Sequence, residues 1–304
     1  MSVDRFQEMQ VFIAVAEEES FAAAARRLDP SAASVTRAVA ALEARLGIML
    51  LSRTTRRVYV SEAGQRYLDD CRRILAELTE AEESAAGSYA IARGQLTITA
   101  PVLFGELYVT PLMVDYLNEH PQVSIKALMV DRVVNMLDEG VDVAVRIGHL
   151  PDSGLYATRV GSVRRVVCAA PAFLERQGRP EHPDQLRDQS AVVIASSPLL
   201  ARWQFKTDTG PIAFLPPSRL VVTANQAAIG AAVAGWGYTC VLSYQIARQV
   251  AKGELEIVLH EYELPPLPIH VVYHGGAKIS ARVRTFVDYC VARLRADPAL
   301  QYSA

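Results

Sequence analysis

The stretch SFAAAARRLDPSAASVTRAVAALEARLG, from Ser20 to Gly47, decides how the N-terminal part of this chain folds. Alanine, the strongest helix former, dominates it, but the triplet DPS around Pro30 breaks the pattern. Proline disfavours helical geometry in the residue before it, so a first helix should end near Leu28. Ser31 is suited to cap a second helix, and Gly47 to end it. The stretch therefore predicts two helices joined by a tight turn.

A further helix and a small hairpin flank these two helices. Apolar residues recur at helical spacing between Phe6 and Ala16, which predicts a helix before the quoted stretch. After it, two short β-prone runs near residues 49–51 and 58–60 enclose a polar tip that is rich in arginine. We expect residues 1–60 to form one domain of three helices and a hairpin.

Two helices joined by a tight turn, the second beginning with small polar residues, have the layout of a helix-turn-helix. In that motif the first residues of the second helix reach base edges in the DNA major groove. Arg37 would read a guanine or hold a phosphate there, and the hairpin arginines would follow the adjacent backbone as a wing. The candidates at the groove are Ser31, Ala33, Ser34, Thr36 and Arg37.

Positive charge is concentrated locally in residues 21–60, although the whole chain of 304 residues has a formal net charge of −2. Residues 21–60 contain seven arginines and two acidic residues, a balance of 7 − 2 = +5. Residues 1–20 have one arginine and five acids, which fits a supporting helix that faces away from DNA. The alternative is a helical hairpin with a solvated arginine face.

A long helix is predicted from Ser61 to about residue 86, followed by the polar stretch GSYAIARG at residues 87–94. Residues 61–93 are therefore expected to form a linker helix and a hinge. Apolar residues step along the helix by four and three, a seam typical of paired helices. We expect this seam to contact a second subunit; the alternative is one amphipathic helix lying on its own domain. The seam residues are Tyr67, Cys71, Ile74, Leu78, Ala81 and Ala85.

Beyond residue 94, strands and helices alternate in the rhythm of parallel sheets covered by helices. Strands are expected at 95–100, 123–129 and 141–147, helices at 104–119 and 133–139, and a less regular middle at 164–223. After residue 223 the sequence again predicts a helix, a strand, a helix and a strand. Residues 94–304 should thus form two lobes, one from 94–163 and 269–304 and the other from 164–268. The expected fold class is α+β with several domains.

Ligands of α/β lobes lie beyond the carboxyl ends of strands, near helix N-termini that favour anions. This rule selects three strand ends in the first lobe and one helix start in the second, and a loop near Ser196 could close over them. The candidate ligand residues are Pro101, Val102, Leu103, Phe104, Asp131, Arg146, Ile147, Gly148, Ser196, Trp203, Asn225 and Gln226.

Arg146 is the most specific of these candidates, because a guanidinium at the end of an apolar strand can bind a carboxylate through two hydrogen bonds. A structural pair with Asp131 or Asp142 is an equally open alternative. Asp131 is also placed to cap the helix expected after it. Trp203, in the same closing loop as Ser196, is expected to serve packing more than ligand stacking, and Trp236, between glycines, is expected in the core.

Several other functions are not supported by the sequence. GxSxG, GxxxxGK[ST] and HExxH are absent, and GAAVAGWG does not match GxGxxG, so we expect no enzyme, no catalytic residue and no cofactor. Four separated cysteines fit reduced thiols in the cytoplasm, and His270 with His274 lacks a third metal ligand. We see neither a signal peptide nor an apolar run of about 18 residues, so no membrane is expected.

Residues 6–68 resemble the N-terminal domain of LysR-type transcriptional regulators, in the motifs FIAVAEEESF, AAARRL, VTRAVAALEARLG, LLSRTTRRV and SEAG. The resemblance continues through VDRVVNMLDEGVDVAVRIG and CAAPAFLERQGRP to the last strands. It implies a winged helix-turn-helix, a linker helix that dimerises, and a two-lobed effector domain similar to periplasmic solute-binding proteins. It also implies that Arg53, Thr54 and Arg56 face the DNA phosphates.

The turn departs from the family pattern, since Asp29 stands where a glycine is usual; aspartate tolerates the left-handed conformation better than most residues. Two function classes follow from the sequence. One is a DNA-binding regulator, a dimer or a dimer of dimers that binds promoter DNA, responds to a small-molecule inducer and contacts RNA polymerase. The other is a solute-binding or enzymatic α/β protein whose N-terminal helices only dimerise. The charge balance and the resemblance favour the first.

Overall fold

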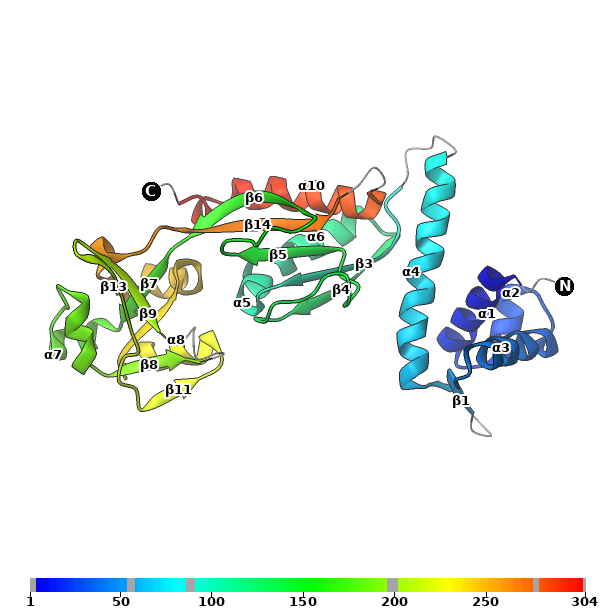
Figure 1. Cartoon of the computed structure of the whole chain (residues 1–304), viewed down its shortest axis with the longest axis horizontal. Helices are drawn as coiled ribbons and strands as arrows, with labels where there is room; N and C mark the ends of the chain where they lie inside the picture. The colour runs from blue at the N-terminus through cyan, green and yellow to red at the C-terminus, as the bar shows by residue number, and fades with distance from the viewer. Residues whose placement is uncertain (1–3, 54–57, 86–90, 196–201, 276–278, 303–304) are drawn as a thin grey trace. The chain divides into compact units, whose positions relative to one another are not determined.

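The computed structural model describes residues 4–53, 58–85, 91–195, 202–275 and 279–302 (Figure 1). They fall into two compact units, one of residues 1–95 with 280–282 and the other of residues 96–279 with 283–304. Within the described ranges, no helix has the length and apolar character that a membrane crossing requires.

The N-terminal unit begins with the three predicted helices, α1 (Arg5–Glu18), α2 (Phe21–Leu28) and α3 (Ala32–Leu46). The Ser31 hydroxyl accepts the N–H of Ser34 at 3.2 Å and so caps α3. Asp29 ends α2 in the left-handed conformation with φ of 72°, and Gly47 ends α3 with φ of 70°. The predicted tight turn is confirmed, with aspartate in the backbone conformation that glycine adopts most easily.

A two-stranded wing follows, with β1 (Leu51–Arg53) antiparallel to β2 (Val58–Val60). Its start is fixed by Glu43 of α3, whose buried carboxylate accepts the backbone N–H groups of Leu50 and Leu51 at 2.8 and 3.0 Å. Helix α4 (Glu62–Ala85) then begins so close to the wing that a Cβ on Gly64 would lie 2.0 Å from the Leu50 carbonyl oxygen. Only glycine fits at this contact.

The first turns of α4 complete the core of the N-terminal unit. Cys71 is fully buried there, and the Tyr67 ring lies 5.7 Å from the Phe12 ring of α1. Cys71 is therefore buried by its own domain, which argues against a place for it in the predicted intersubunit seam, whereas Tyr67 is only half-buried and its contact with a second subunit stays a prediction. Ile74 and Leu78 are half-buried. Ala81 and Ala85 belong to α4, but their side chains lie outside the described part of the chain.

The C-terminal unit contains two five-stranded sheets, and we call each sheet with its helices a lobe. The sheet of lobe I has the order β4-β3-β5-β14-β6, in which β3 is parallel to β5 and β14 is antiparallel to both neighbours. The sheet of lobe I is thus mixed: β3 and β5 are parallel, as the sequence predicted, and the antiparallel pairs are those of β14. Its strands are β3 (Gly94–Ala100), β4 (Val123–Met129), β5 (Val143–Ile147), β6 (Leu155–Val163) and β14 (Leu267–His274).

Lobe I has an almost continuous helical run after β3, made of α5 (Val102–Phe104), a π-helical turn (η1, Gly105–Val109) and α6 (Thr110–Glu119). The π turn has a local cause: Pro111 has no N–H for the Leu107 carbonyl, while Thr110 donates to the Gly105 carbonyl through its backbone. Tyr116 of α6 packs edge-on against Phe286 of α10 (Ala281–Ala296), with ring centres 5.0 Å apart.

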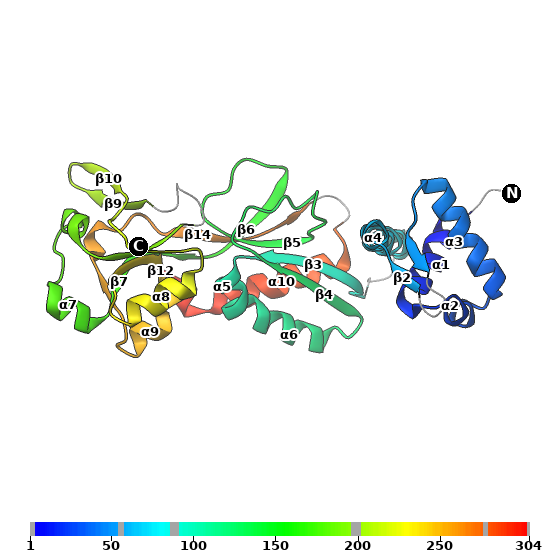
Figure 2. The ribbon, with the colours of Figure 1, turned by 90° about the horizontal axis from the view of Figure 1, so that it is seen from below.

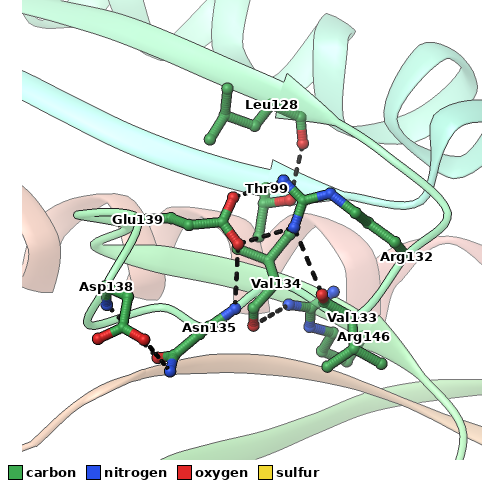
Figure 3. Close-up of polar contacts among 9 residues, drawn as sticks. All are labelled: Thr99, Leu128, Arg132, Val133, Val134, Asn135, Asp138, Glu139 and Arg146. Carbon is green, nitrogen blue, oxygen red and sulfur yellow. Dashed lines mark hydrogen bonds and ion pairs between the residues drawn. The ribbon is translucent and has the colours of Figure 1, made fainter.

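The helix predicted at residues 133–139 is absent, because side chains take the backbone hydrogen bonds that a helix would use (Figure 3). Asn135 accepts the N–H groups of Leu137 and Asp138 with its side-chain oxygen, and Glu139 accepts the N–H of Asn135. We call residues 131–140 the cover segment, since its Val134 and Met136 pack on the lobe I sheet.

Lobe II has the sheet order β11-β8-β12-β7-β13 and a separate hairpin of two strands (Figure 2). The middle expected to be irregular therefore contains regular strands. The sheet strands are β7 (Arg165–Ala169), β8 (Ala191–Ile194), β11 (Leu220–Val222), β12 (Tyr238–Leu242) and β13 (Glu256–Val258). The hairpin and the helices of lobe II are β9 (Trp203–Thr207), β10 (Gly210–Phe214), α7 (Pro171–Gln177), η2 (Pro183–Asp188), α8 (Asn225–Val233), η3 (Ser243–Ile246), α9 (Ala247–Ala251) and η4 (His260–Tyr262). The last helical turn, η5 (Pro298–Leu300), contacts β6 of lobe I.

The chain crosses from lobe I to lobe II between β6 and β7 and returns between β13 and β14. Arg164 of the first crossing donates to both carboxylate oxygens of Glu263 in the second, at 2.8 and 2.9 Å. Both side chains are largely buried, with exposed fractions of 18% and 11%. The Arg164 guanidinium also lies 4.7 Å from the centre of the Tyr302 ring. The two crossings are thus held as one hinge.

Candidate functional site

The start of α3 carries a row of polar side chains spaced three residues apart. The Ser31 and Ser34 hydroxyls lie 2.9 Å from each other, and Arg37 donates from Nη2 to the Ser34 hydroxyl at 3.4 Å. Arg37 also donates from Nε to the Ala33 carbonyl at 3.3 Å, and Thr36 turns its hydroxyl to the Ala32 carbonyl. Ser31, Ala33 and Arg37 are exposed. The predicted groove residues therefore lie on the first two turns of one helix.

Two of the seven arginines counted as DNA-facing charges have other partners. Arg27 donates to Glu17 of α1 at 2.8 Å, and Arg45 donates to Glu8 of α1 at 2.8 Å. The count of +5 is therefore too high for a DNA surface, because the acids that neutralise these arginines lie earlier in the chain. Arg37 makes no carboxylate contact within the described ranges.

The acids of α1 also attach α4 to the helix-turn-helix. Glu17 accepts from Arg72 of α4 at 2.7 Å, in addition to Arg27 of α2. Burial raises the pKa of Glu17, but the hydrogen bonds from Arg72 and Arg27 outweigh it, so that its pKa lies below the usual 4.5. Glu8 keeps only 4% of its side chain exposed. These acids, which the sequence placed on a supporting helix facing away from DNA, join α1 to α2, α3 and α4.

The wing contacts predicted at Arg53, Thr54 and Arg56 remain predictions. Arg53 ends strand β1, but its side chain lies outside the described part of the chain, as do Thr54 and Arg56.

In lobe I, the residues after β3 are held in place by Asp131. Its carboxylate accepts the N–H of Val102 at 3.0 Å, at the start of α5. Asp131 therefore caps the helix before it rather than the one predicted after it, which does not form. Leu103 and Phe104 are buried, whereas Pro101 is half-buried and Val102 is exposed.

Arg146, near the end of β5, is half-buried and points to the cover segment (Figure 3). Its Nη2 donates to the Val134 carbonyl at 3.1 Å, and no carboxylate pairs with it among the residues that the structure describes. The alternative pairing with Asp131 or Asp142 does not occur: Asp142 accepts the N–H of Thr97 at 2.7 Å. Burial lowers the pKa of Arg146, Glu139 counteracts this, and nearby Arg132 lowers it further.

Arg132 shows the opposite arrangement in the same close-up. It donates from Nη1 and Nη2 to the two oxygens of Glu139 at 2.7 and 2.6 Å (Figure 3). The negative charge nearest to Arg146 is thus already bound by another arginine. A half-buried guanidinium without a carboxylate is the kind of group that binds an anion.

One hydrogen bond joins a predicted ligand residue of lobe II to lobe I. Gln226, in the first turn of α8, donates from Nε2 to Glu106 Oε2 of η1 at 2.9 Å. Asn225 stands at the first position of α8. An aromatic cluster also spans the lobes, because Tyr244 of η3 packs edge-on against Phe104 and Tyr108, with centroids 5.3 and 5.9 Å apart. Sequence reasoning missed Glu106, Tyr108 and Tyr244, which carry no local signal.

The other predicted ligand residues lie in different parts of the C-terminal unit or outside the described residues. Ile147 and Gly148 end β5 half-buried, and the Gly148 N–H donates to the Pro268 carbonyl at 2.8 Å. Trp203 starts β9 and is 3% exposed in the lobe II core, so it packs as expected but does not lie in a closing loop. Trp236, expected in the core, is 44% exposed. Ser196 lies outside the described residues.

Titratable groups elsewhere point to no metal centre. Within the described ranges, no three His, Cys, Asp or Glu side chains are grouped to hold a metal ion. The four cysteines are free. Burial raises the pKa of Cys71 to about 11 and of Cys168 to about 12, so that both are thiols at neutral pH.

Comparisons with known proteins match both units. The family described as "Bacterial regulatory helix-turn-helix protein, lysR family" matches residues 6–65, and "LysR substrate binding domain" matches residues 91–295. An HTH-type transcriptional regulator of Xanthomonas campestris pv. campestris is 34% identical over 94% of this chain and 85% of its own. The HTH-type transcriptional activator AaeR of Escherichia coli K12 is 30% identical over 94% of this chain and 93% of its own. The structure of CrgA, a LysR-type transcriptional regulator from Neisseria meningitidis, matches with a TM-score of 0.61 and 27% identity over 95% of this chain and 98% of that one.

Proposed function

Because this chain belongs to the LysR family of DNA-binding transcriptional regulators, we propose that it reads a paired promoter site through α3 and that a small molecule between lobes I and II controls the reading. The family consists of regulators and not of enzymes, which excludes the enzymatic alternative. The two halves of the proposal rest on different contacts.

The row Ser31–Ser34–Arg37 supports the DNA half of the proposal. Small hydroxyl side chains let the start of α3 enter a major groove, and among the described residues the Arg37 guanidinium bonds only to Ala33 and Ser34 of its own helix. These weak internal bonds are exchanged for a bidentate bond to a guanine or a phosphate when DNA arrives. The wing carries Arg53, Thr54 and Arg56 along the adjacent backbone.

The bond between Gln226 and Glu106 supports the effector half. It brings the start of α8 in lobe II to the helical run of lobe I, where Pro101, Val102 and Asn225 are also accessible. A helix start favours an anionic or polar group, and here Glu106 occupies that place. A ligand that competes for Gln226 changes how the lobes meet, about the hinge of Arg164 and Glu263.

Control of DNA binding then requires at least two copies of the chain. We assign pairing to the part of α4 from Ile74 onward, including Leu78, Ala81 and Ala85, since the earlier turns are buried in their own domain. Two dimers joined through their C-terminal units would bind an interrupted palindrome. A ligand alters such an assembly only through unequal affinity for its two arrangements. A change in DNA spacing or bend would then alter contact with RNA polymerase.

Genome-wide footprinting of the purified protein on fragmented host DNA tests the DNA half. We expect discrete sites with two half-sites for the wild type, and their loss for Arg37→Ala. Arg179→Ala, which removes an exposed arginine of lobe II, is the matched control and should keep every site. Diffuse binding that is equal in all three proteins would contradict the proposal.

The effector half is tested with metabolites of the enzymes encoded beside the footprinted sites. A true effector shifts operator affinity in the wild type by 5- to 150-fold, the usual range of about 1–3 kcal/mol for allosteric coupling. The shift should disappear in Asn225→Ala and persist in Asn118→Ala, a control at an exposed asparagine of α6. An equal shift in both variants would place the effector elsewhere.

A further inference from the structure

Three basic residues stand side by side on the lobe I sheet. In the antiparallel register, His270 of β14 is the partner of Arg146 on β5 and of Arg159 on β6. These strands lie next to one another in the sheet (Figure 1). Directly opposed residues of antiparallel strands project to the same face, with Cβ atoms about 5 Å apart. We call this set the basic row.

The basic row lies on the face that the cover segment partly protects. Two residues along the strands, Ala144 and Val272 are also partners, and both pack in one cluster with Val134 and Met136 of the cover segment. Arg146 accordingly reaches the Val134 carbonyl, whereas Arg159 is exposed. The row therefore runs from a half-buried end to an end open to solvent.

No carboxylate pairs with either arginine of the row, as far as the structure describes the chain. Arg159 donates from Nε to the Gly161 carbonyl at 3.4 Å, and Arg146 to a carbonyl of the cover segment. Glu139 is bound by Arg132 through two hydrogen bonds. Like charges placed across neighbouring strands destabilise a sheet. The contacts of the described residues therefore do not explain how two arginines beside one histidine would stabilise the sheet.

His270 also points to a ligand site, in addition to the shared sheet face and the two arginines that no described carboxylate pairs with. Its Nδ1 is buried and has no hydrogen-bond partner among the described residues, which is rare in folded proteins. Burial lowers the pKa of His270, Arg159 and His149 lower it further, and the backbone of Gly148 acts in the opposite direction. The imidazole is thus neutral at neutral pH and would gain a proton beside an anion.

We propose that the basic row Arg146–His270–Arg159 is an anion site of lobe I that binds a small molecule bearing carboxylate groups. Neighbouring strands are about 4.8 Å apart, so the Cα atoms of the two arginines are about 10 Å apart. Their guanidinium groups reach one carboxylate from both sides, or the two ends of a short dicarboxylate. The proposal rests on the proposed effector control for its effect on DNA, but not for binding itself.

Isothermal titration calorimetry of the full chain with succinate, acetate and inorganic phosphate tests this site, with succinamide as the uncharged analogue of succinate. We expect succinate to bind and succinamide not to bind. Arg146→Gln and Arg159→Gln should each weaken succinate binding 10- to 100-fold, as loss of a charged hydrogen bond does. Arg176→Gln is the matched control, since this exposed arginine of lobe II also bonds one backbone carbonyl, and its binding should be unchanged.

Titration at pH 6 in two buffers of different ionisation enthalpy adds a readout that a structural role would not change. Succinate should bring proton uptake in the wild type and not in His270→Gln. The other charged or titratable groups near the basic row are Arg146, Arg159, Arg132, Glu139 and His149, and His149→Gln should leave the proton uptake unchanged. Uptake that His270→Gln retains would contradict the site.

Other outcomes separate this proposal from effector control. If none of the three anions binds, or Arg159→Gln binds as well as Arg176→Gln, the anion site is wrong. Stronger binding of phosphate than of succinate would overturn the carboxylate assignment. If succinate binds through the basic row but leaves operator affinity unchanged, the anion site is supported and its role in effector control is contradicted.

Discussion

The arginines around α1 in the N-terminal unit and those of the basic row in lobe I differ in their hydrogen-bond partners. In the N-terminal unit, Arg27, Arg45 and Arg72 all bond to glutamates of α1. In lobe I, the partners of Arg146 and Arg159 among the described residues are backbone carbonyls. Arg37 resembles the second group, since its bonds go to a carbonyl and a hydroxyl.

The difference separates two roles for the same side chain. An arginine with a carboxylate partner is already neutralised, and it joins elements of the fold. An arginine without one keeps its charge and its donors for a ligand. The partner of an arginine is therefore more informative about function than its presence in the sequence.

The largest effect should come from breaking the hinge pair. Arg164→Met removes both hydrogen bonds that the guanidinium donates to the Glu263 carboxylate, which is 11% exposed and keeps the exposed His260 ring at 3.2 Å, and should cost about 3 kcal/mol of unfolding free energy. Thermal and urea unfolding followed by the fluorescence of Trp203 and Trp236 would measure it, since both report on lobe II. A loss below about 1 kcal/mol would show that this pair is not structural.

Arg146→Met tests, within the C-terminal unit, the difference between an arginine that has a carboxylate partner and one that has none among the described residues. It removes a half-buried cation that no described carboxylate balances, so stability should stay within about 0.5 kcal/mol of the wild type or increase. Circular dichroism melts of Arg146→Met and Arg164→Met give the contrast directly. Equal destabilisation of both would break the distinction between paired and unpaired arginines.

In the N-terminal unit, Arg45→Met should cost about 2 kcal/mol. It leaves Glu8 buried without a partner, but Arg45 itself is 34% exposed, so the loss is smaller than the roughly 3–5 kcal/mol of a fully buried pair. The measurement is urea unfolding of the full chain, with Arg66→Met as control because that pair is exposed on both sides. A similar loss in the control would contradict the assignment.

The cap of α3 should have an effect of about 1 kcal/mol. Ser31→Ala removes the hydroxyl that accepts the Ser34 N–H, and N-cap serines stabilise a helix by about that amount. Ser52→Ala, in an exposed position of β1, is the control. Unfolding free energies that are the same for both variants would mean that the cap adds nothing.

A small effect that depends on pH is expected at Glu17. Because its folded pKa lies below 4.5, its contribution is fully present above pH 4.5 and is lost as pH falls through the folded value. With 32% of the Glu17 side chain exposed, we expect Glu17→Gln to cost about 0.5–1 kcal/mol at pH 7. The difference from the wild type should shrink below pH 4.5. A difference that stays constant to pH 3 would exclude the ion pairs as its cause.

The helix-turn-helix was predictable because its signals are local. Pro30, the cap at Ser31 and the left-handed turn at Asp29 act within a few residues of one another. The surface charge was less predictable, since Arg45 finds Glu8, 37 positions earlier in the chain. A count of charges along the sequence cannot include such a partner.

The C-terminal unit was less predictable because distant residues and competing side chains decide its contacts. Asn135 and Glu139 take backbone bonds that the apolar pattern assigned to a helix. Gln226 was selected correctly as a residue at a helix start, but its partner Glu106 lies 120 positions away. The basic row arises only from strand register, which places His270 beside Arg146 and has no sequence signal.

The most direct test of the account compares Arg37→Ala with Arg27→Ala on one footprinted DNA site and on unrelated DNA, by fluorescence anisotropy at several salt concentrations. Arg37→Ala should lower the ratio of specific to non-specific affinity about 5- to 150-fold, the loss of one base contact of about 1–3 kcal/mol. Arg27→Ala, whose guanidinium is held by Glu17, should leave that ratio unchanged. Equal losses in the two variants would contradict the claim that an arginine without a carboxylate partner is the one that reads a ligand.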